Sequence, residues 1–223
     1  MLFLQQTGGK MNQLSKCLLF ENMNEKDIQE ALSCFHSYTK SYQKNETIYH
    51  TGEHIHCLGI VLEGLVQIEN NDVWGNHSLL NHIYPYQVFG ETYAYLDEAL
   101  RVDIIALQKS EILFLDLKQI HSHPECVHHQ KIIQNLLSIT MESNLNLSRR
   151  MIHTSSKTIR SRLLSYLSDE AIIQKNNHFS IPYNRQQLAD YLAVDRSALS
   201  HELSQMKKEG LIDYHKNHFH LKV

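Results

Sequence analysis

The sequence predicts an α+β fold in which an N-terminal β jelly roll leads, through a long helix, into a C-terminal winged helix-turn-helix. Three observations support this order: short apolar runs separated by turn residues, then a long uninterrupted amphipathic stretch, then a capped pair of helices followed by two short strands. We expect a β-barrel domain over residues 1–125, a long helix and hinge over residues 126–152, and a winged helix-turn-helix domain over residues 153–223.

The first half of the chain has the pattern of one short helix followed by a small β-barrel. Residues 25–35 are amphipathic, with Ile28, Leu32 and Phe35 on one side. After them, turn residues separate apolar runs about every eight to twelve positions, which is typical of a sandwich or jelly roll. The expected strands are 47–49, 58–62, 65–68, 78–80, 102–107 and 111–115, and the intervening glycines Gly52, Gly64, Gly75 and Gly90 suit turns.

A long helix is expected from about Val127 to Met151, where the sequence has no glycine or proline. A heptad seam with two polar positions runs along it, at Ile133, Leu137, Thr140, Asn144, Leu147 and Met151. This seam predicts a homodimer; the alternative is a helix that packs on its own domain. A further helix over 157–173 would bury Ile159, Leu163, Tyr166, Leu167 and Ala171.

The most informative stretch, residues 184–210, has the pattern of a helix, a tight turn and a second helix. Asn184 is a good N-cap, and Gln187 three residues later suits a reciprocal capping box. Asp195 would cap the second helix after a break at 193–194. The second helix would bury Leu199, Leu203 and Met206, which recur at helical spacing.

The opposite face of that second helix is small, polar and basic, which suits close approach to base edges in the DNA major groove. It carries Arg196, Ser197, Ser200, His201, Ser204 and Lys208. Strands are expected over 211–215 and 218–221, around a Lys216-Asn217 turn, with another over 179–182. A hairpin after a recognition helix is typical of a winged helix-turn-helix; an ordinary helical hairpin with a solvated polar face is the alternative.

Charge is divided unevenly along the chain. Residues 149–223 hold 12 Lys and Arg against 7 Asp and Glu, a net of +5, whereas residues 1–148 hold 9 against 17, a net of −8. A basic C-terminal part on an acidic body is typical of a DNA-binding domain attached to a different module. Chance asymmetry is the alternative.

Composition excludes several other classes. The sequence has no apolar run of about 18 residues, so no membrane span is expected. Its four dispersed cysteines favour a reduced, bacterial-type cytoplasm over a disulfide framework. It has no Gly-x-Ser-x-Gly, Walker or His-Glu-x-x-His motif, so we do not expect an enzyme. The rival hypothesis is a ligand- or metal-binding regulatory module that acts through protein contacts without specific DNA binding.

With this order of elements, the chain resembles the Crp/Fnr family of bacterial transcription regulators. The similar segments are residues 49–53, 61–66 and 88–91 in the first half, and residues 185–189 and 195–200 in the second. The resemblance implies a cyclic-nucleotide-binding-like domain that senses an effector, a homodimer that binds a palindromic operator, and contact with RNA polymerase if the protein is an activator.

The family's DNA contacts carry over to named positions here. The start of the recognition helix would contact bases through Arg196, Ser197 and His201, with Ser200 on the same face. Arg185 and Gln186 would lie near phosphates. Many family members have Glu where this chain has Ser197, so the expected half-site differs from that of the cyclic-AMP receptor.

The expected effector pocket lies in the first half, at Gly90, Glu91, Thr92, Arg101 and Val102. Cyclic-nucleotide binders in the family follow their arginine with a hydroxyl and a small residue, whereas Val102 and Asp103 follow Arg101 here. Bulky Tyr93 and Tyr95 would narrow the pocket. The sequence therefore favours another small ligand, or none, over a cyclic nucleotide. The alternative is that Gly90 forms a turn and Arg101 is a surface residue.

A second candidate sensor is a cluster of histidines and a cysteine before the long helix. His121, His123, Cys126, His128 and His129 offer ligands compatible with zinc, copper or iron. A polar loop in a histidine-rich chain is the favoured alternative. An Fnr-type iron–sulfur cluster is disfavoured because clustered N-terminal cysteines are absent. The sequence thus leaves the cofactor unknown.

Overall fold

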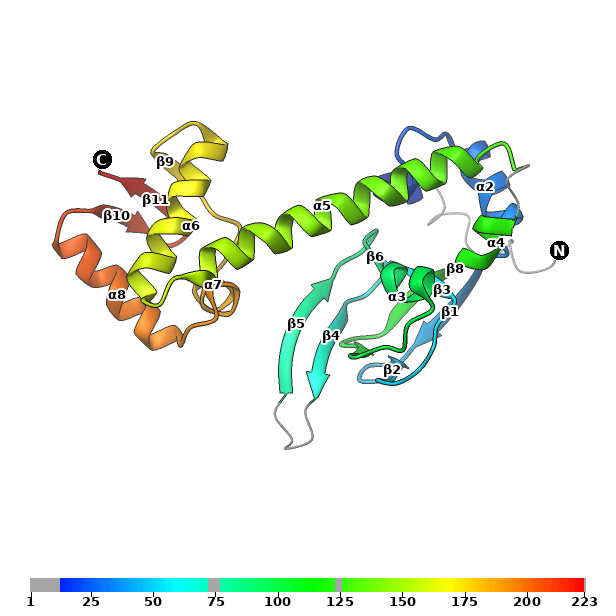
Figure 1. The fold of residues 1–223 in the computed structure, drawn as a ribbon, viewed down its shortest axis with the longest axis horizontal. Coiled ribbons are helices and arrows are strands. Elements are labelled where there is room, and N and C mark those ends of the chain that lie inside the picture. Colours follow the sequence, from blue (N-terminus) through cyan, green and yellow to red (C-terminus); the bar gives the residue numbers. More distant parts are fainter. Residues whose placement is uncertain (1–12, 72–76, 123–125, 223) are drawn as a thin grey trace. The chain divides into compact units, whose positions relative to one another are not determined.

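The computed structural model describes residues 13–71, 77–122 and 126–222 (Figure 1). The chain divides into two compact units, Met1–Met141 and Glu142–Val223. The boundary between them falls inside the long helix α5 (His129–Ser155). Each unit therefore includes part of that helix.

The N-terminal unit begins with two short 3-10 helices, η1 (Leu14–Lys16) and η2 (Leu18–Phe20), and the helix α2 (Glu25–Cys34). Asn24 caps α2 in a reciprocal capping box with Asp27. Ile28, Leu32 and Phe35 are buried, which confirms the expected amphipathic helix.

Two four-stranded antiparallel sheets follow, and together they form the expected jelly roll. The first has the order β1-β8-β3-β6, with β1 (Tyr38–Tyr42), β8 (Ser110–Asp116), β3 (Cys57–Glu63) and β6 (Val88–Phe89). The second has the order β2-β7-β4-β5, with β2 (Thr47–Tyr49), β7 (Asp103–Ala106), β4 (Val66–Asn71) and β5 (His77–Ile83).

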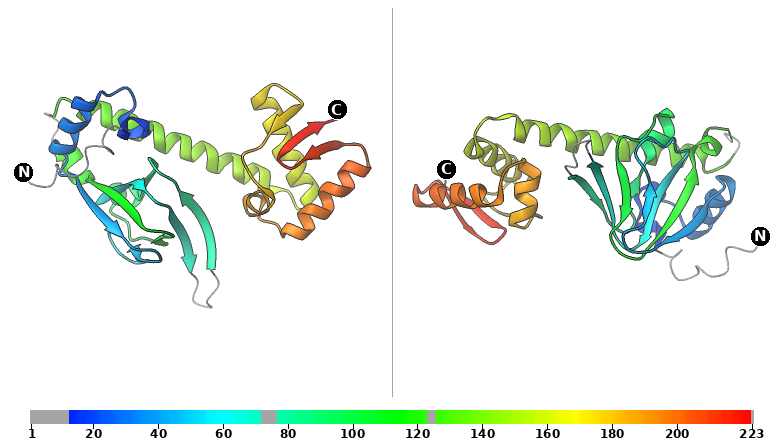
Figure 2. Two further views of the ribbon diagram at one scale, coloured as in Figure 1. Left: turned by 180° about the vertical axis from the view of Figure 1, so that it is seen from behind. Right: turned by 90° about the horizontal axis from the view of Figure 1, so that it is seen from below.

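The two sheets face each other and enclose an apolar core (Figure 2). Tyr49 from one sheet meets Phe114 from the other with ring centroids 5.9 Å apart. Gly59 on β3 is needed for close packing, because a Cβ there would lie 2.3 Å from the ring of Phe89. Gly90 ends β6 with φ +77° and begins the short helix α3 (Glu91–Leu96), while α4 (Leu117–Ser122) follows β8.

The glycines expected in turns behave as the sequence predicts where the structure describes them. Gly52, Gly64 and Gly90 all have positive φ. Gly75 lies outside the described residues.

The first turns of α5 belong to the N-terminal unit. The buried Asn135 donates from Nδ2 to the carbonyls of Leu19 (2.9 Å) and Glu21 (3.1 Å). Ile133 is partly buried against the same core. This residue of the expected seam therefore contacts the N-terminal core, and its place in a dimer stays a prediction.

The C-terminal unit is a winged helix-turn-helix, as expected. Its helices are α6 (Ile159–Gln174), α7 (Arg185–Leu192) and α8 (Arg196–Lys208). Its three-stranded sheet has the order β10-β11-β9, with β10 (Ile212–His215), β11 (His218–Leu221) and β9 (His178–Ser180). Leu163, Tyr166 and Leu167 of α6 are buried and pack with α7, α8 and the sheet in one core. In the described part of the chain, no helix has both the length and the apolar character that crossing a membrane requires.

Candidate nucleic-acid interface and sensor pocket

The helix-turn-helix is built from two well-capped helices. The Asn184 side chain accepts from the Gln187 N–H at 3.0 Å, and the Gln187 side chain accepts from the Asn184 N–H at 2.9 Å. After a turn in which Ala193 is left-handed (φ +53°), Asp195 caps α8 by accepting from the Ala198 N–H at 2.9 Å. Both N-caps predicted from the sequence are therefore confirmed.

The second helix of the motif, α8, separates an apolar face from a polar one. Leu199, Leu203 and Met206 are fully buried. On the opposite side, Arg196, Ser197 and His201 are exposed, and Ser200 is half-exposed. The residues proposed to contact bases therefore share one solvent-facing side of a helix whose other side is fixed in the core.

Three serine hydroxyls on this side have local acceptors. Ser197 donates to the Asp195 carboxylate, Ser200 to the Arg196 carbonyl (2.9 Å) and Ser204 to the Ser200 carbonyl (2.9 Å). The Ser197 hydroxyl and the Ala198 N–H hold the pKa of Asp195 below its ordinary value. Each serine therefore presents oxygen lone pairs, which act as hydrogen-bond acceptors, to a bound molecule.

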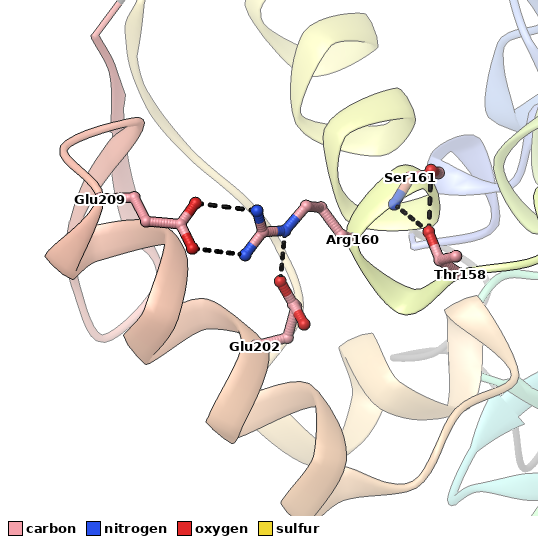
Figure 3. Close-up of polar contacts among 5 residues, drawn as sticks. All are labelled: Thr158, Arg160, Ser161, Glu202 and Glu209. Atoms are coloured by element: carbon pink, nitrogen blue, oxygen red, sulfur yellow. Dashed lines mark hydrogen bonds and ion pairs between the residues drawn. The ribbon is translucent and has the colours of Figure 1, made fainter.

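Arg160 on α6 binds two carboxylates of the α8 segment (Figure 3). The Arg160 guanidinium donates to Glu209 through both terminal nitrogens at 2.8 Å and to Glu202 through Nε at 2.6 Å. Thr158 caps α6 just before it, accepting from the Ser161 N–H at 3.1 Å. A bidentate pair of this kind fixes direction as well as distance, so α6 sets the position of α8.

The wing strand β10 is tied to both helices of the motif through Tyr214. The Arg185 guanidinium lies 5.1 Å and the Lys207 ammonium 5.4 Å from the centre of the Tyr214 ring. Lys207 also pairs with Asp213 at 2.5 Å. Burial lowers the pKa of Arg185, against the opposing influence of Tyr214. Arg185 is thus half-buried against the wing, while its neighbour Gln186 is exposed and donates to Asp190 at 2.8 Å.

A pocket of about 530 Å³ opens between the start of α7 and the turn of the wing. Its lining includes Asn184, Arg185 and Gln187 from the helix, and Lys216 and Asn217 from the turn. The two cations and the N-terminus of α7 favour negative charge at this place.

Sequence reasoning missed the residues that hold the end of α7. Arg162 donates through Nη1 to the carbonyls of Leu192 and Ala193, both at 3.0 Å, and Arg150 binds the two carbonyls before them. No local sequence pattern predicts these contacts, because each arginine and its acceptor lie about thirty to forty positions apart. Only the folded chain brings them together.

The expected effector pocket is only partly assembled. Gly90 is the left-handed N-cap of α3, and Thr92 donates to the Glu91 carboxylate at 3.2 Å. Arg101 is exposed, and among the described residues no hydrogen bond joins it to Glu91 or Thr92. Val102 is buried in the core, at 8% exposure, so this position contributes a core contact.

Two further side chains near this segment are used by the fold. Asp103 accepts from the Thr51 N–H at 2.8 Å and lies 4.0 Å from His50. Tyr93 is partly buried against the core, whereas Tyr95 is exposed. The Asp103 carboxylate is therefore bound to the loop after β2.

The histidine and cysteine cluster is only partly covered by the structure. His123 and the side chain of His121 lie outside what it describes. His128 places Nε2 3.0 Å from the Glu30 carboxylate, and Cys126 is partly buried against the core. Over residues 13–71, 77–122 and 126–222, no group of three or more His, Cys, Asp or Glu side chains is arranged to hold a metal ion.

Comparisons with known proteins agree with this architecture. A family model described as a cyclic nucleotide-binding domain matches residues 39–122, and one described as a Crp-like helix-turn-helix domain matches residues 161–222. The chain is 24% identical over 189 residues to the transcriptional activator protein FnrL of Cereibacter sphaeroides, covering 78% of this chain and 72% of FnrL. It is also 24% identical over 177 residues to the transcriptional regulator LdrP of Thermus thermophilus, covering 78% of this chain and 86% of LdrP.

Among solved structures, CprK complexed with OCPA superposes with a TM-score of 0.68 at 14% identity, covering 87% of this chain and 92% of CprK. FixK2 from Bradyrhizobium japonicum superposes with a TM-score of 0.53 at 18% identity, covering 84% of this chain and 93% of FixK2. At these identities the superpositions show that the fold is shared.

A jelly roll that matches the cyclic nucleotide-binding domain, joined to a Crp-like winged helix-turn-helix, defines a class of two-part transcription regulators. The chain belongs to the Crp/Fnr family within that class.

Proposed function

We propose that this regulator binds a palindromic DNA operator as a homodimer, with α8 of each copy in the major groove. One observation carries the proposal: α8 buries Leu199, Leu203 and Met206 completely while its polar side remains open to solvent. A helix that enters the major groove needs this combination. Its buried face must be packed rigidly on the domain, and its exposed face must carry small side chains that allow close approach to the bases. The net charge of +5 over residues 149–223 supplies the attraction to phosphates.

The base contacts are assigned to Arg196, Ser197, Ser200 and His201. Arg196, at the first turn of α8, would donate both arms of its guanidinium to a guanine. The serine oxygens would accept from the amino group of an adenine or a cytosine, because their own hydrogens are already donated within the helix. Arg185 and Gln186 would lie near phosphates, and the Tyr214 ring would hold the Arg185 guanidinium in place.

The dimer would form along α5. Large apolar side chains are exposed along the helix at Leu137, Met141, Leu145, Leu147, Met151 and Ile152. Three of them, Met141, Leu145 and Ile152, lie outside the seam expected from the sequence, so the apolar stripe is broader than a two-position heptad. A second copy of α5 is the proposed partner, because one helix-turn-helix reads only a half-site and a palindrome requires two.

The N-terminal unit is proposed to sense an effector other than a cyclic nucleotide. A cyclic phosphate needs converging donors, and the buried Val102 provides no hydroxyl beside Arg101. Titration calorimetry with cyclic AMP and cyclic GMP tests this: we expect no binding at micromolar concentrations, and micromolar affinity would contradict it. An activator of this kind would also contact RNA polymerase.

The DNA-binding proposal is tested by selecting bound duplexes from random DNA with the full-length protein. We expect a palindromic sequence to be enriched. Arg196→Ala should then cost about 1–3 kcal/mol in specific binding and relax preference at one base of each half-site. Lys157→Ala is the matched control, since Lys157 is an exposed cation of the same unit outside α8. Equal losses in the two variants, or no enriched sequence, would contradict the proposal.

A further inference from the structure

The last turns of α5 are fastened to the first helix of the helix-turn-helix. Arg150 donates through Nε to the Tyr191 carbonyl and through Nη2 to the Asp190 carbonyl, both at 3.0 Å. Its guanidinium also lies 5.7 Å from the centre of the Tyr191 ring. The last carbonyls of a helix have no partner within it, so they are ready acceptors. A planar guanidinium that binds two of them fixes the direction of α7 as well as its distance from α5.

A buried histidine one turn further along α5 makes a second attachment. His153 is 3% exposed, and its Nδ1 lies 2.9 Å from the Tyr191 hydroxyl. Its Nε2 lies 3.4 Å from a carboxylate oxygen of Asp169 on α6. The ring also packs edge-on against Tyr166, with centroids 5.5 Å apart. Since both ring nitrogens have partners on different helices, His153 joins α5 to α6 and α7 at once.

The same end of α7 is held from the other side by Arg162 of α6, which binds the carbonyls of Leu192 and Ala193. The four carbonyls from Asp190 to Ala193 are therefore all bound, two by α5 and two by α6. Asp195, the cap of α8, follows two residues after Ala193. The position at which α7 ends, and at which α8 begins, is thus set by α5 and α6 together.

We propose that Arg150 and His153 are positioning residues that fix the orientation of the recognition helix relative to α5. Their contacts, made with backbone carbonyls and with the side chains of Tyr191, Asp169 and Tyr166, hold α7 in one direction on α5. The proposal rests on the proposed function, in which paired α5 helices place two recognition helices about 34 Å apart on an operator. In such a dimer, this joint determines which half-site spacing is accepted, whereas the α8 side chains determine which bases are read.

The experiment compares four duplexes carrying the selected operator sequence: the palindrome at its native spacing, a palindrome lengthened by one base pair, one shortened by one base pair, and a single half-site. Equilibrium dissociation constants are measured for the full-length wild type, Arg150→Met and Arg150→Lys. Met keeps the aliphatic stem, and Lys keeps the charge without the fork. Arg149→Met is the matched control, because it removes the same charge from the neighbouring position.

For Arg150→Met we expect about tenfold weaker binding to the native palindrome, because two charge-assisted hydrogen bonds are lost. Half-site binding should change by less than about threefold, since α8 itself is intact, and the penalty for altered spacing should shrink by about tenfold. Arg150→Lys should fall between wild type and Arg150→Met. Arg149→Met should keep the wild-type spacing preference.

Tyr191→Phe removes only the hydroxyl next to His153. This variant keeps the proposal testable if Arg150→Met does not fold. It should relax the spacing preference in the same direction. Unchanged spacing preference in Tyr191→Phe and in every folded Arg150 variant would overturn the proposal. Equal weakening on the half-site and the palindromes would also overturn it, because that result means a general loss of folding or contact. If the wild type binds none of the four duplexes, the proposed function itself fails. That outcome is distinct from the one in which the wild type binds and the variants keep its spacing preference.

Discussion

The two units of this regulator use their polar side chains in opposite ways. In the C-terminal unit, Arg196, Ser197 and His201 stand exposed on α8, and the cations behind them are held by carboxylates, carbonyls and rings. In the N-terminal unit, some residues at the expected pocket have structural contacts instead. Val102 is buried in the core, and the Asp103 carboxylate accepts a hydrogen bond from the Thr51 N–H. The expected site residues are therefore exposed together on the C-terminal unit, whereas in the N-terminal unit the expected pocket is only partly assembled.

The largest effect is expected on stability, at the buried face of α8. Leu203→Ala should lower the free energy of unfolding of the C-terminal unit by about 2–5 kcal/mol, because Leu203 is completely buried. Its exposed neighbour Ser204 is the matched control, and Ser204→Ala should change stability by less than about 0.5 kcal/mol. Scanning calorimetry of the full-length protein measures both. Similar small shifts in the two variants would mean that α8 is not packed on this side.

A second large effect is expected on α5, which belongs in part to each unit. Leu137 is 52% exposed, and Leu137→Glu should weaken dimerisation by about 100-fold, since a charge would enter an apolar seam. Asn146 is also exposed and lies about two and a half turns further along, on the opposite side of the helix. Asn146→Glu should leave the dimer intact. Sedimentation measures both constants, and a dimer that survives Leu137→Glu would remove this stripe as the interface.

The contrast can be sharpened at two adjacent residues of the N-terminal unit. Val102→Ser should destabilise the N-terminal unit by about 1–3 kcal/mol, because it removes buried methyl groups and buries a hydroxyl. Arg101→Ala, at an exposed position, should change stability by less than about 0.5 kcal/mol. Thermal unfolding of both variants is the measurement. A Val102→Ser protein as stable as wild type would show that this position faces an open pocket rather than the core.

The features predicted correctly from sequence depend on residues close together in the chain. The capping box of Asn184 with Gln187 and the buried row of Leu199, Leu203 and Met206 need only helical spacing, and both are confirmed. By contrast, β1 has four exposed residues out of five, so it offers no apolar pattern to recognise. The strand β6 has only two residues.

The missed contacts share a physical reason. Arg150, Arg160 and Arg162 bind partners about thirty to fifty positions away, and a charged side chain gives no sign of its partner until the chain has folded. The partner of the apolar side of α5 is hidden from the sequence for a related reason. Periodicity identified an apolar side of α5, but it could not say whether a second copy or the chain's own jelly roll covers each residue.

The smallest effect concerns a charge pair beside the wing. Lys207 and the Tyr214 N–H hold the pKa of Asp213 below its ordinary value of 3.8. Lys207→Met should raise this pKa toward 3.8, as followed by NMR titration of the carboxyl group, whereas Lys208→Met should leave it unchanged. Because the pKa is lowered in the folded state, the pair stabilises the protein above pH 3.8, and this contribution is lost as the pH falls through the folded-state pKa.

The Lys207–Asp213 pair also tests which cations of the C-terminal unit attract phosphates and which bind carboxylates of the protein. If Lys207 is committed to Asp213, it adds little to phosphate attraction, and Lys207→Met should leave the salt dependence of operator binding close to that of wild type. Arg196 on α8 is exposed and has no carboxylate partner among the described residues, so Arg196→Ala should lower that slope. A Lys207→Met protein whose slope falls as much as that of Arg196→Ala would show that Lys207 serves the DNA, and the distinction between holding and reading residues in this unit would have to be redrawn.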